Sequence, residues 1–145
     1  MKHWKESQDE VRTVRKDMEM AKSISKMIEL RIKAVEMLDS ETFATLKVED
    51  YYEIIKEAIT ALMAISGYKT LSHEVLIGYL KEFYKEFPES EIRFIDQLRQ
   101  LRNKIAYKGL FVKKDYLDRN EQRMKEIVRK LKNILESNLR SHALI

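Results

Sequence analysis

The stretch from Tyr51 to Ile65 limits the possible folds more than any other part of the sequence. Its apolar residues recur at helical spacing and cover a wide arc, while Glu53, Lys56 and Glu57 belong to a narrow polar strip. An arc of this width is typical of a central helix that packs on more than one neighbour. We therefore predict a buried helix from about Glu49 to Ser66, ended by a glycine at position 67.

Four further helices are expected from the same periodicity. The first would run from about Glu6 to Leu38, a length of ~50 Å. Such a helix would either bend near residues 23–25 or project its start toward a partner. The others are predicted from Ser72, as N-cap, to Phe87, from Ser90 or Glu89 to Gly109, and from about Leu117 to Leu139.

Composition supports a single all-α domain over residues 1–145, which we expect to form a five-helix up-and-down bundle. The chain has only three Gly and one Pro among 145 residues, so it offers few turns of the kind that join strands. It has no cysteine, which excludes disulfides and thiolate metal sites. No apolar run approaches the ~20 residues of a membrane span, and the start is too polar for a signal peptide. We expect a cytoplasmic protein without a membrane partner.

Charge is distributed unevenly along the chain. Residues 1–96 hold 15 Lys/Arg against 19 Asp/Glu, whereas residues 97–145 hold 13 against 5. A basic segment of this kind suggests a surface that faces a polyanion such as RNA. Attraction between the two segments within the fold would explain the same asymmetry.

Arg102 lies where a helix of residues 89–108 should be apolar. With Phe94 at zero on a helical wheel, Leu98, Leu101 and Ile105 fall within about 40°, and Arg102 falls at about 80°. An unpaired buried charge is costly, so Arg102 must meet a carboxylate, a carbonyl, a subunit interface or an anion. A salt bridge to Glu53, to Glu57 or to another acid of residues 49–66 would satisfy it as well as a phosphate would.

The residues after Arg102 favour an anion. If the helix continued, Tyr107 would point about 140° away from Arg102, and either unwinding near Ala106 or a second subunit could bring the two together. Residues 97–114 hold no acidic side chain. The basic residues that we expect to contact nucleic acid are Arg99, Lys104, Lys108, Lys113 and Lys114.

Residues 102–107 and 51–80 together resemble the HEPN superfamily of small helical-bundle proteins. The hallmark of that superfamily is an arginine, commonly followed by asparagine, with a histidine four to six residues further along. Arg102 and Asn103 match the first half, and Tyr107 stands where the histidine is expected. The aromatic start of residues 51–66, the Gly67 turn and the Ser72-His73 opening of the next helix extend the resemblance.

The resemblance implies a homodimer with both arginine motifs in one cleft, of a fold similar to nucleotidyltransferase substrate-binding subunits. Catalytic members are metal-independent ribonucleases without cofactors, often toxins of toxin–antitoxin pairs encoded beside a nucleotidyltransferase. It implies that Arg102 stabilises phosphate charge, that Asn103 orients it or contacts substrate, and that Tyr107 occupies the altered catalytic position. Tyr107 is a poor base, because a phenol with a pKa near 10 is ionised in only about one molecule in a thousand at neutral pH.

Two interpretations stay open at this point. In the first, the protein is a dimer that binds RNA or a nucleotide phosphate, with or without residual cleavage. In the second, it is a non-catalytic partner of a nucleotidyltransferase or another acidic protein. His73 is a possible replacement base, but a histidine at the start of a helix more often caps or packs against its own turn. No motif indicates a metal site.

Overall fold

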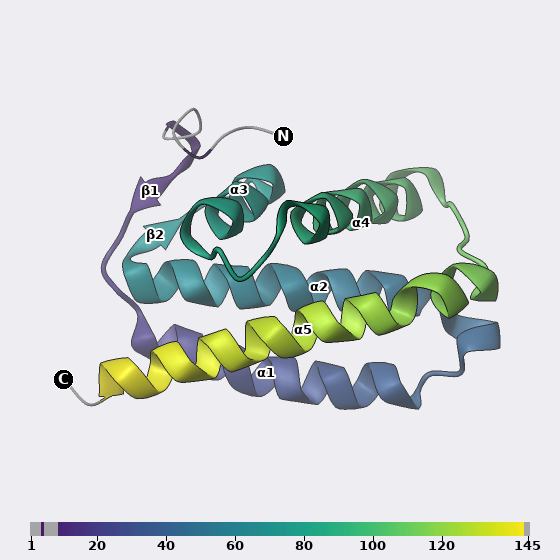
Figure 1. Cartoon of the computed structure of the whole chain (residues 1–145), viewed down its shortest axis with the longest axis horizontal. Helices are drawn as coiled ribbons and strands as arrows, with labels where there is room; N and C mark the ends of the chain where they lie inside the picture. The colour runs from purple at the N-terminus through teal and green to yellow at the C-terminus, as the bar shows by residue number, and fades with distance from the viewer. Residues whose placement is uncertain (1–3, 5–8, 144–145) are drawn as a thin grey trace.

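The computed structural model describes residues 4 and 9–143. Their fold is all-α, with five helices and one very short pair of strands (Figure 1). The elements in chain order are β1 (Arg12–Thr13), α1 (Met18–Met37), α2 (Ser40–Ser66), β2 (Tyr68–Lys69), α3 (His73–Phe83), α4 (Glu89–Lys108) and α5 (Lys114–Ala143). The prediction of an all-α helical bundle is confirmed.

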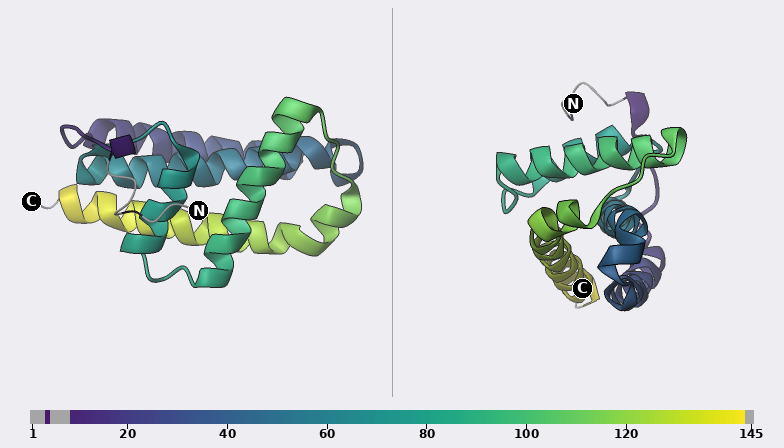
Figure 2. Two further views of the ribbon diagram at one scale, coloured as in Figure 1. Left: turned by 90° about the horizontal axis from the view of Figure 1, so that it is seen from above. Right: turned by 90° about the vertical axis from the view of Figure 1, so that its right-hand side faces the viewer.

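Helix α2 lies at the centre, between α3 and α4 on one side and α1 and α5 on the other (Figure 1). Viewed from above, α4 crosses obliquely over the long helices beneath it (Figure 2). The core follows this arrangement, because apolar side chains on both sides of α2 are buried, including Ile54, Ile55, Ile59 and Leu62. The wide apolar arc of this helix is therefore accounted for by neighbours on two sides.

Helix α1 begins at Met18, and residues 9–17 do not belong to it. The predicted start at about Glu6 is therefore wrong for these residues, and Glu6 itself lies outside the part of the chain that the structure describes. Asp17 is the N-cap, and its side chain accepts a hydrogen bond of 2.9 Å from the backbone N–H of Met20. The residues before it bond along the end of α2, where Val14 N–H donates to Gly67 O at 2.9 Å. The helix is one continuous segment through residues 23–25, where a bend was one of the two alternatives.

Helix α2 begins nine residues earlier than predicted, at Ser40, and is kinked at Phe43. Asp39 caps it through the backbone N–H of Thr42 at 2.9 Å. The added turns are held by Lys47, whose buried ammonium donates to Ser40 Oγ at 3.0 Å and pairs with Glu121 of α5 at 3.0 Å. A contact between residues so far apart in sequence is invisible to helical periodicity.

The predicted end of α3 at Phe87 is also wrong, because the helix ends at Phe83. A residue that precedes proline is disfavoured in helical geometry, and Phe87 precedes Pro88. Phe87 is nonetheless buried, with the Lys130 ammonium 4.7 Å from the centre of its ring. The predicted bounds of α4 agree with the structure, whereas α5 starts at Lys114, three residues before the predicted Leu117.

Two glycines end helices in the left-handed conformation, and they differ in their surroundings. Gly67 closes α2 at φ 83°, and Gly109 closes α4 at φ 66°. A Cβ added at Gly67 would lie 2.9 Å from the Val14 carbonyl oxygen, whereas one added at Gly109 would meet nothing within 4 Å.

We therefore expect Gly67→Ala to destabilise the fold more than Gly109→Ala does. Both substitutions place a Cβ in left-handed backbone, which costs about 1–2 kcal/mol. Only the first adds a clash with a backbone oxygen, that of Val14, a residue whose N–H donates to Gly67 O. Thermal unfolding measures the difference, at roughly 3 °C per kcal/mol for a domain of this size. Equal melting temperatures for the two variants would contradict this explanation.

Candidate functional site

A pocket of about 480 Å³ lies where the start of α3 meets the second half of α4. One residue of the central helix α2, Lys56, completes its wall. Most of its lining is polar or charged: Lys56, Leu71, Ser72, His73, Glu74, Arg99, Arg102, Asn103 and Tyr107. Four of the residues predicted from sequence to form the site, Arg99, Arg102, Asn103 and Tyr107, therefore line one pocket.

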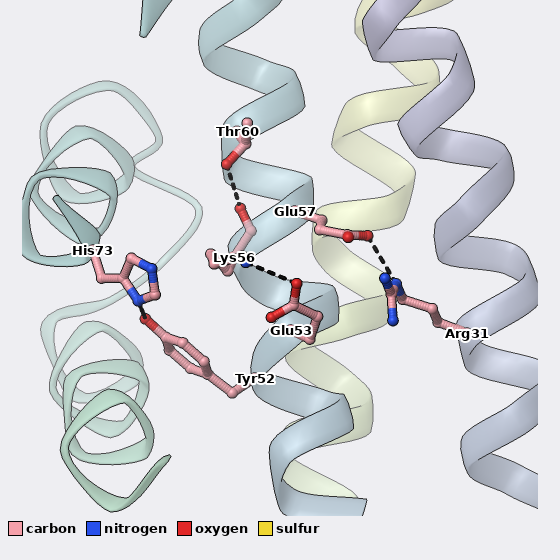
Figure 3. Close-up of polar contacts among 7 residues, drawn as sticks. All are labelled: Arg31, Tyr52, Glu53, Lys56, Glu57, Thr60 and His73. Carbon is pink, nitrogen blue, oxygen red and sulfur yellow. Dashed lines mark hydrogen bonds and ion pairs between the residues drawn. The ribbon is translucent and has the colours of Figure 1, made fainter. Parts of the chain in front are cut away.

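Arg102 is half-buried, lines this pocket and has no acidic partner among the residues that the structure describes. Among residues 4 and 9–143, none forms a hydrogen bond or an ion pair with it. The two α2 acids considered as partners are engaged elsewhere (Figure 3). Glu53 pairs with Lys56 at 2.7 Å, and Glu57 pairs with Arg31 of α1 at 3.1 Å. Neither Glu53 nor Glu57 therefore neutralises Arg102.

Arg99 lines the same pocket but is paired. Its Nε donates to Asp96 Oδ1 at 2.8 Å, and its Nη1 lies 3.8 Å from Glu74 Oε1. Only 15% of its side chain is exposed. Two acids thus hold Arg99 in place, so it contributes less net positive charge to the pocket than Arg102 does.

Asn103 and Tyr107 reach the pocket from a helix that does not unwind. Helix α4 continues through Lys108, so unwinding near Ala106 is not what brings Tyr107 toward Arg102. The Tyr107 ring is 79% exposed at the edge of the pocket. An exposed aromatic ring next to a cationic pocket is suited to stacking on a nucleobase.

The lysines predicted to contact nucleic acid lie on the exposed surface around the end of α4. Lys104 and Lys108 are exposed on the helix, and Lys113 and Lys114 are exposed in or beside the loop that follows. Lys114 pairs with Asp118 one turn along α5, with 3.2 Å between the charged atoms. None of the four lines the pocket itself, so they extend its positive charge outward.

His73 is the first residue of α3 and lines the pocket. Its ring points toward Tyr52 of α2 (Figure 3). Its Nδ1 lies 3.1 Å from the phenol oxygen of Tyr52, a buried residue of α2. The two rings are tilted by 35° with their centres 5.8 Å apart. The expectation that His73 only caps or packs against its own turn is wrong, because its partner is on another helix. Ser72 is the residue that caps α3, accepting from Val75 N–H at 3.3 Å.

Burial lowers the pKa of His73 below its ordinary value of 6.5, and the charges of Lys56 and Arg102 lower it further. The carboxylate of Glu53 acts in the opposite direction but does not reverse the shift. His73 is therefore a neutral imidazole near pH 7. Burial also raises the pKa of Tyr52 above that of an ordinary phenol, so its hydroxyl keeps its proton.

Comparisons with protein-family models, curated proteins and solved structures gave no match. We therefore infer function from the geometry of this pocket. Over residues 4 and 9–143, no group of three or more His, Asp or Glu side chains is placed to hold a metal ion. No helix within those residues is both long and apolar enough to cross a membrane.

The electrostatic coupling in the pocket can be measured by NMR titration of His73. Its pKa is expected below 6.5, and Arg102→Ala should raise it, because removing a nearby positive charge favours the imidazolium. The matched control is Arg93→Ala, which removes an exposed arginine of α4 that pairs with Glu89 at 3.9 Å. A His73 pKa that does not respond to Arg102→Ala, or responds equally to Arg93→Ala, would contradict this description.

Proposed function

We propose that this chain is a HEPN-like protein that binds RNA or a nucleotide phosphate, with Arg102 as the phosphate clamp. One observation carries the proposal: Arg102 is half-buried, lines a pocket and has no acidic partner among the described residues. A planar guanidinium can hold two phosphate oxygens through parallel charge-assisted hydrogen bonds. A bound phosphate would give it the counter-charge that the fold does not supply.

The surroundings of Arg102 support an anionic rather than a neutral ligand. Lys56, which is paired with Glu53, and Arg99, which is paired with Asp96 and Glu74, also line the pocket. Asn103 adds an amide that can donate to a phosphate oxygen. Lys104 and Lys108 project from the same helix into solvent. A chain of phosphates that leaves the pocket would therefore meet further positive charge.

The proposed assembly is a homodimer in which the pockets of two copies open toward a shared cleft. The resemblance in residues 102–107 motivates this arrangement. As a dimer, the protein would act on RNA in the cytoplasm, either as a ribonuclease toxin or as a relative of one that has lost cleavage activity. Its protein partner would be a nucleotidyltransferase. The alternative is a non-catalytic protein whose basic surface binds an acidic partner, and the binding experiment below separates the two.

Binding of a short single-stranded RNA, measured by gel shift across a salt series, tests the proposed phosphate clamp. We expect Arg102→Ala to weaken binding by about tenfold to a hundredfold, since a hydrogen bond to a charged group contributes about 1.5–3 kcal/mol. The slope of log affinity plotted against log salt concentration should also become shallower by about one, because one phosphate contact is lost.

Arg93→Ala is the matched control, because it removes the same charge from the same helix at an exposed position outside the pocket. It should leave the affinity within about twofold of wild type, since surface ion pairs contribute little. RNA binding that is equally weak in wild type and Arg102→Ala would overturn the proposal. That result would favour the protein-partner alternative.

The exposed Tyr107 ring in the pocket lining, together with the exposed Phe111 ring four residues later in the chain, predicts a preference for unpaired bases. Tyr107 is 79% exposed and Phe111 is 84% exposed, with lysines between and after them. Tyr107→Ala should weaken binding of single-stranded RNA by about 1–3 kcal/mol, the usual contribution of one base stacked on an aromatic ring. Tyr107→Phe should bind as wild type does. Fluorescence anisotropy can measure both, and a wild type that prefers a duplex of the same length would contradict the prediction.

A further inference from the structure

Among the residues of the pocket lining, only His73 combines three features. It presents a ring nitrogen that can accept a proton at neutral pH, it lines the same pocket as Arg102, and its orientation is fixed by a residue in the core. The partner that fixes it, Tyr52, is 2% exposed and belongs to the central helix α2. A proton acceptor held by a third group is the arrangement found in acid–base catalysis.

We propose that His73 is the proton acceptor in a metal-independent cleavage of single-stranded RNA at the phosphodiester bound by Arg102. This inference rests on the proposed function, because it takes the phosphate in the pocket as given. It differs from the expectation drawn from residues 102–107, which places catalysis on α4 alone. Here the base comes from α3 and the cation from α4, and no histidine is needed at position 107.

The proposed chemistry is a transesterification. His73 takes the proton of the ribose 2′-hydroxyl, and the 2′-oxygen forms a bond to phosphorus. The bond from phosphorus to the 5′-oxygen of the next nucleotide then breaks, and that oxygen takes a proton from water. The resulting hydroxide takes the proton back from the His73 imidazolium, so the neutral imidazole is restored. The products are a 2′,3′-cyclic phosphate and a free 5′-hydroxyl, with no change of oxidation state. Arg102 stabilises the extra negative charge on the phosphorane oxygens as the bonds exchange.

The tautomer of His73 decides whether Nδ1 donates to the Tyr52 hydroxyl or accepts from it, and the proposed role requires the tautomer in which Nδ1 donates. When Nδ1–H donates to the Tyr52 oxygen, 3.1 Å away, Nε2 carries the free lone pair. After proton transfer the imidazolium keeps the same hydrogen bond, and the phenol oxygen faces a positive rather than a neutral ring. Tyr52 is thus a positioning residue, and its hydroxyl stays protonated throughout because burial raises its pKa.

The charges around His73 set its pH dependence. Burial and the cations Lys56, Arg102 and Arg99 lower its pKa, and Glu53 raises it. The rate should therefore increase with pH through the pKa of His73, which lies below 6.5, and become constant above it. The remaining titratable groups that line this part of the molecule are Tyr52, Glu74, Asp96 and Tyr107.

The test incubates the full chain with a labelled single-stranded RNA in the presence of EDTA and identifies the product ends. His73→Gln and His73→Ala should slow cleavage by about a hundredfold or more, the usual contribution of a general base. A second oligonucleotide, with 2′-deoxy sugars throughout, has no 2′-hydroxyl and cannot be cleaved in this way. It therefore measures binding alone. His73→Gln should bind this substrate within about threefold of wild type, because Arg102 still holds the phosphate.

Tyr52→Phe separates positioning from packing, because it removes one hydroxyl and leaves the ring. Cleavage should slow by about tenfold, and the pH at which the rate levels off should move with the His73 pKa measured by NMR. A purely structural role would lower the melting temperature without moving that pH.

The outcomes distinguish the two proposals. If wild type binds the 2′-deoxy strand through Arg102 but does not cleave RNA, or if His73→Gln cleaves as fast as wild type, the role of His73 is overturned while the phosphate site stands. If wild type binds neither substrate, the phosphate site itself is overturned. Cleavage that is lost with His73→Gln and retained in EDTA supports both.

Discussion

The fold depends on the burial of α2 on two sides, and the free charge at the pocket follows from that burial. Because α3 and α4 cover one side of α2 and α1 and α5 cover the other, the polar residues in the second half of α2 form a narrow strip of Glu53, Lys56, Glu57 and Thr60. In this strip Glu53 pairs with Lys56 and Glu57 pairs with Arg31. Helix α2 therefore has no free acid among these residues for Arg102, which faces the pocket with its charge uncompensated by an ion pair.

Much of the fold could be predicted from sequence, because helical periodicity and helix-ending residues act locally. Gly67 and Gly109 end α2 and α4 as expected, since each adopts the left-handed conformation that glycine tolerates best. The starts of helices were harder to predict. Met18 begins α1 because the preceding residues bond to the end of α2, and the early turns of α2 are held by Lys47 through Glu121 of α5. These interactions join distant parts of the chain.

The sequence grouped only those pocket residues that lie on one helix. Arg99, Arg102, Asn103 and Tyr107 share α4, so sequence spacing was enough to bring them together, and the structure places all four in one pocket lining. Lys56 and His73 come from α2 and α3. Nothing in their local sequence links them to Arg102. His73 was interpreted as part of its own helical turn because its partner, Tyr52, lies 21 residues away.

The central claim is that the Arg102 guanidinium binds a phosphate of RNA. The most direct test is a crystal structure of the protein with a short, single-stranded 2′-deoxy oligonucleotide. We expect one backbone phosphate within hydrogen-bonding distance of the Arg102 guanidinium, in the pocket between the start of α3 and the end of α4. An oligonucleotide bound elsewhere, with Arg102 turned toward an acid of this chain or of a second copy, would contradict it.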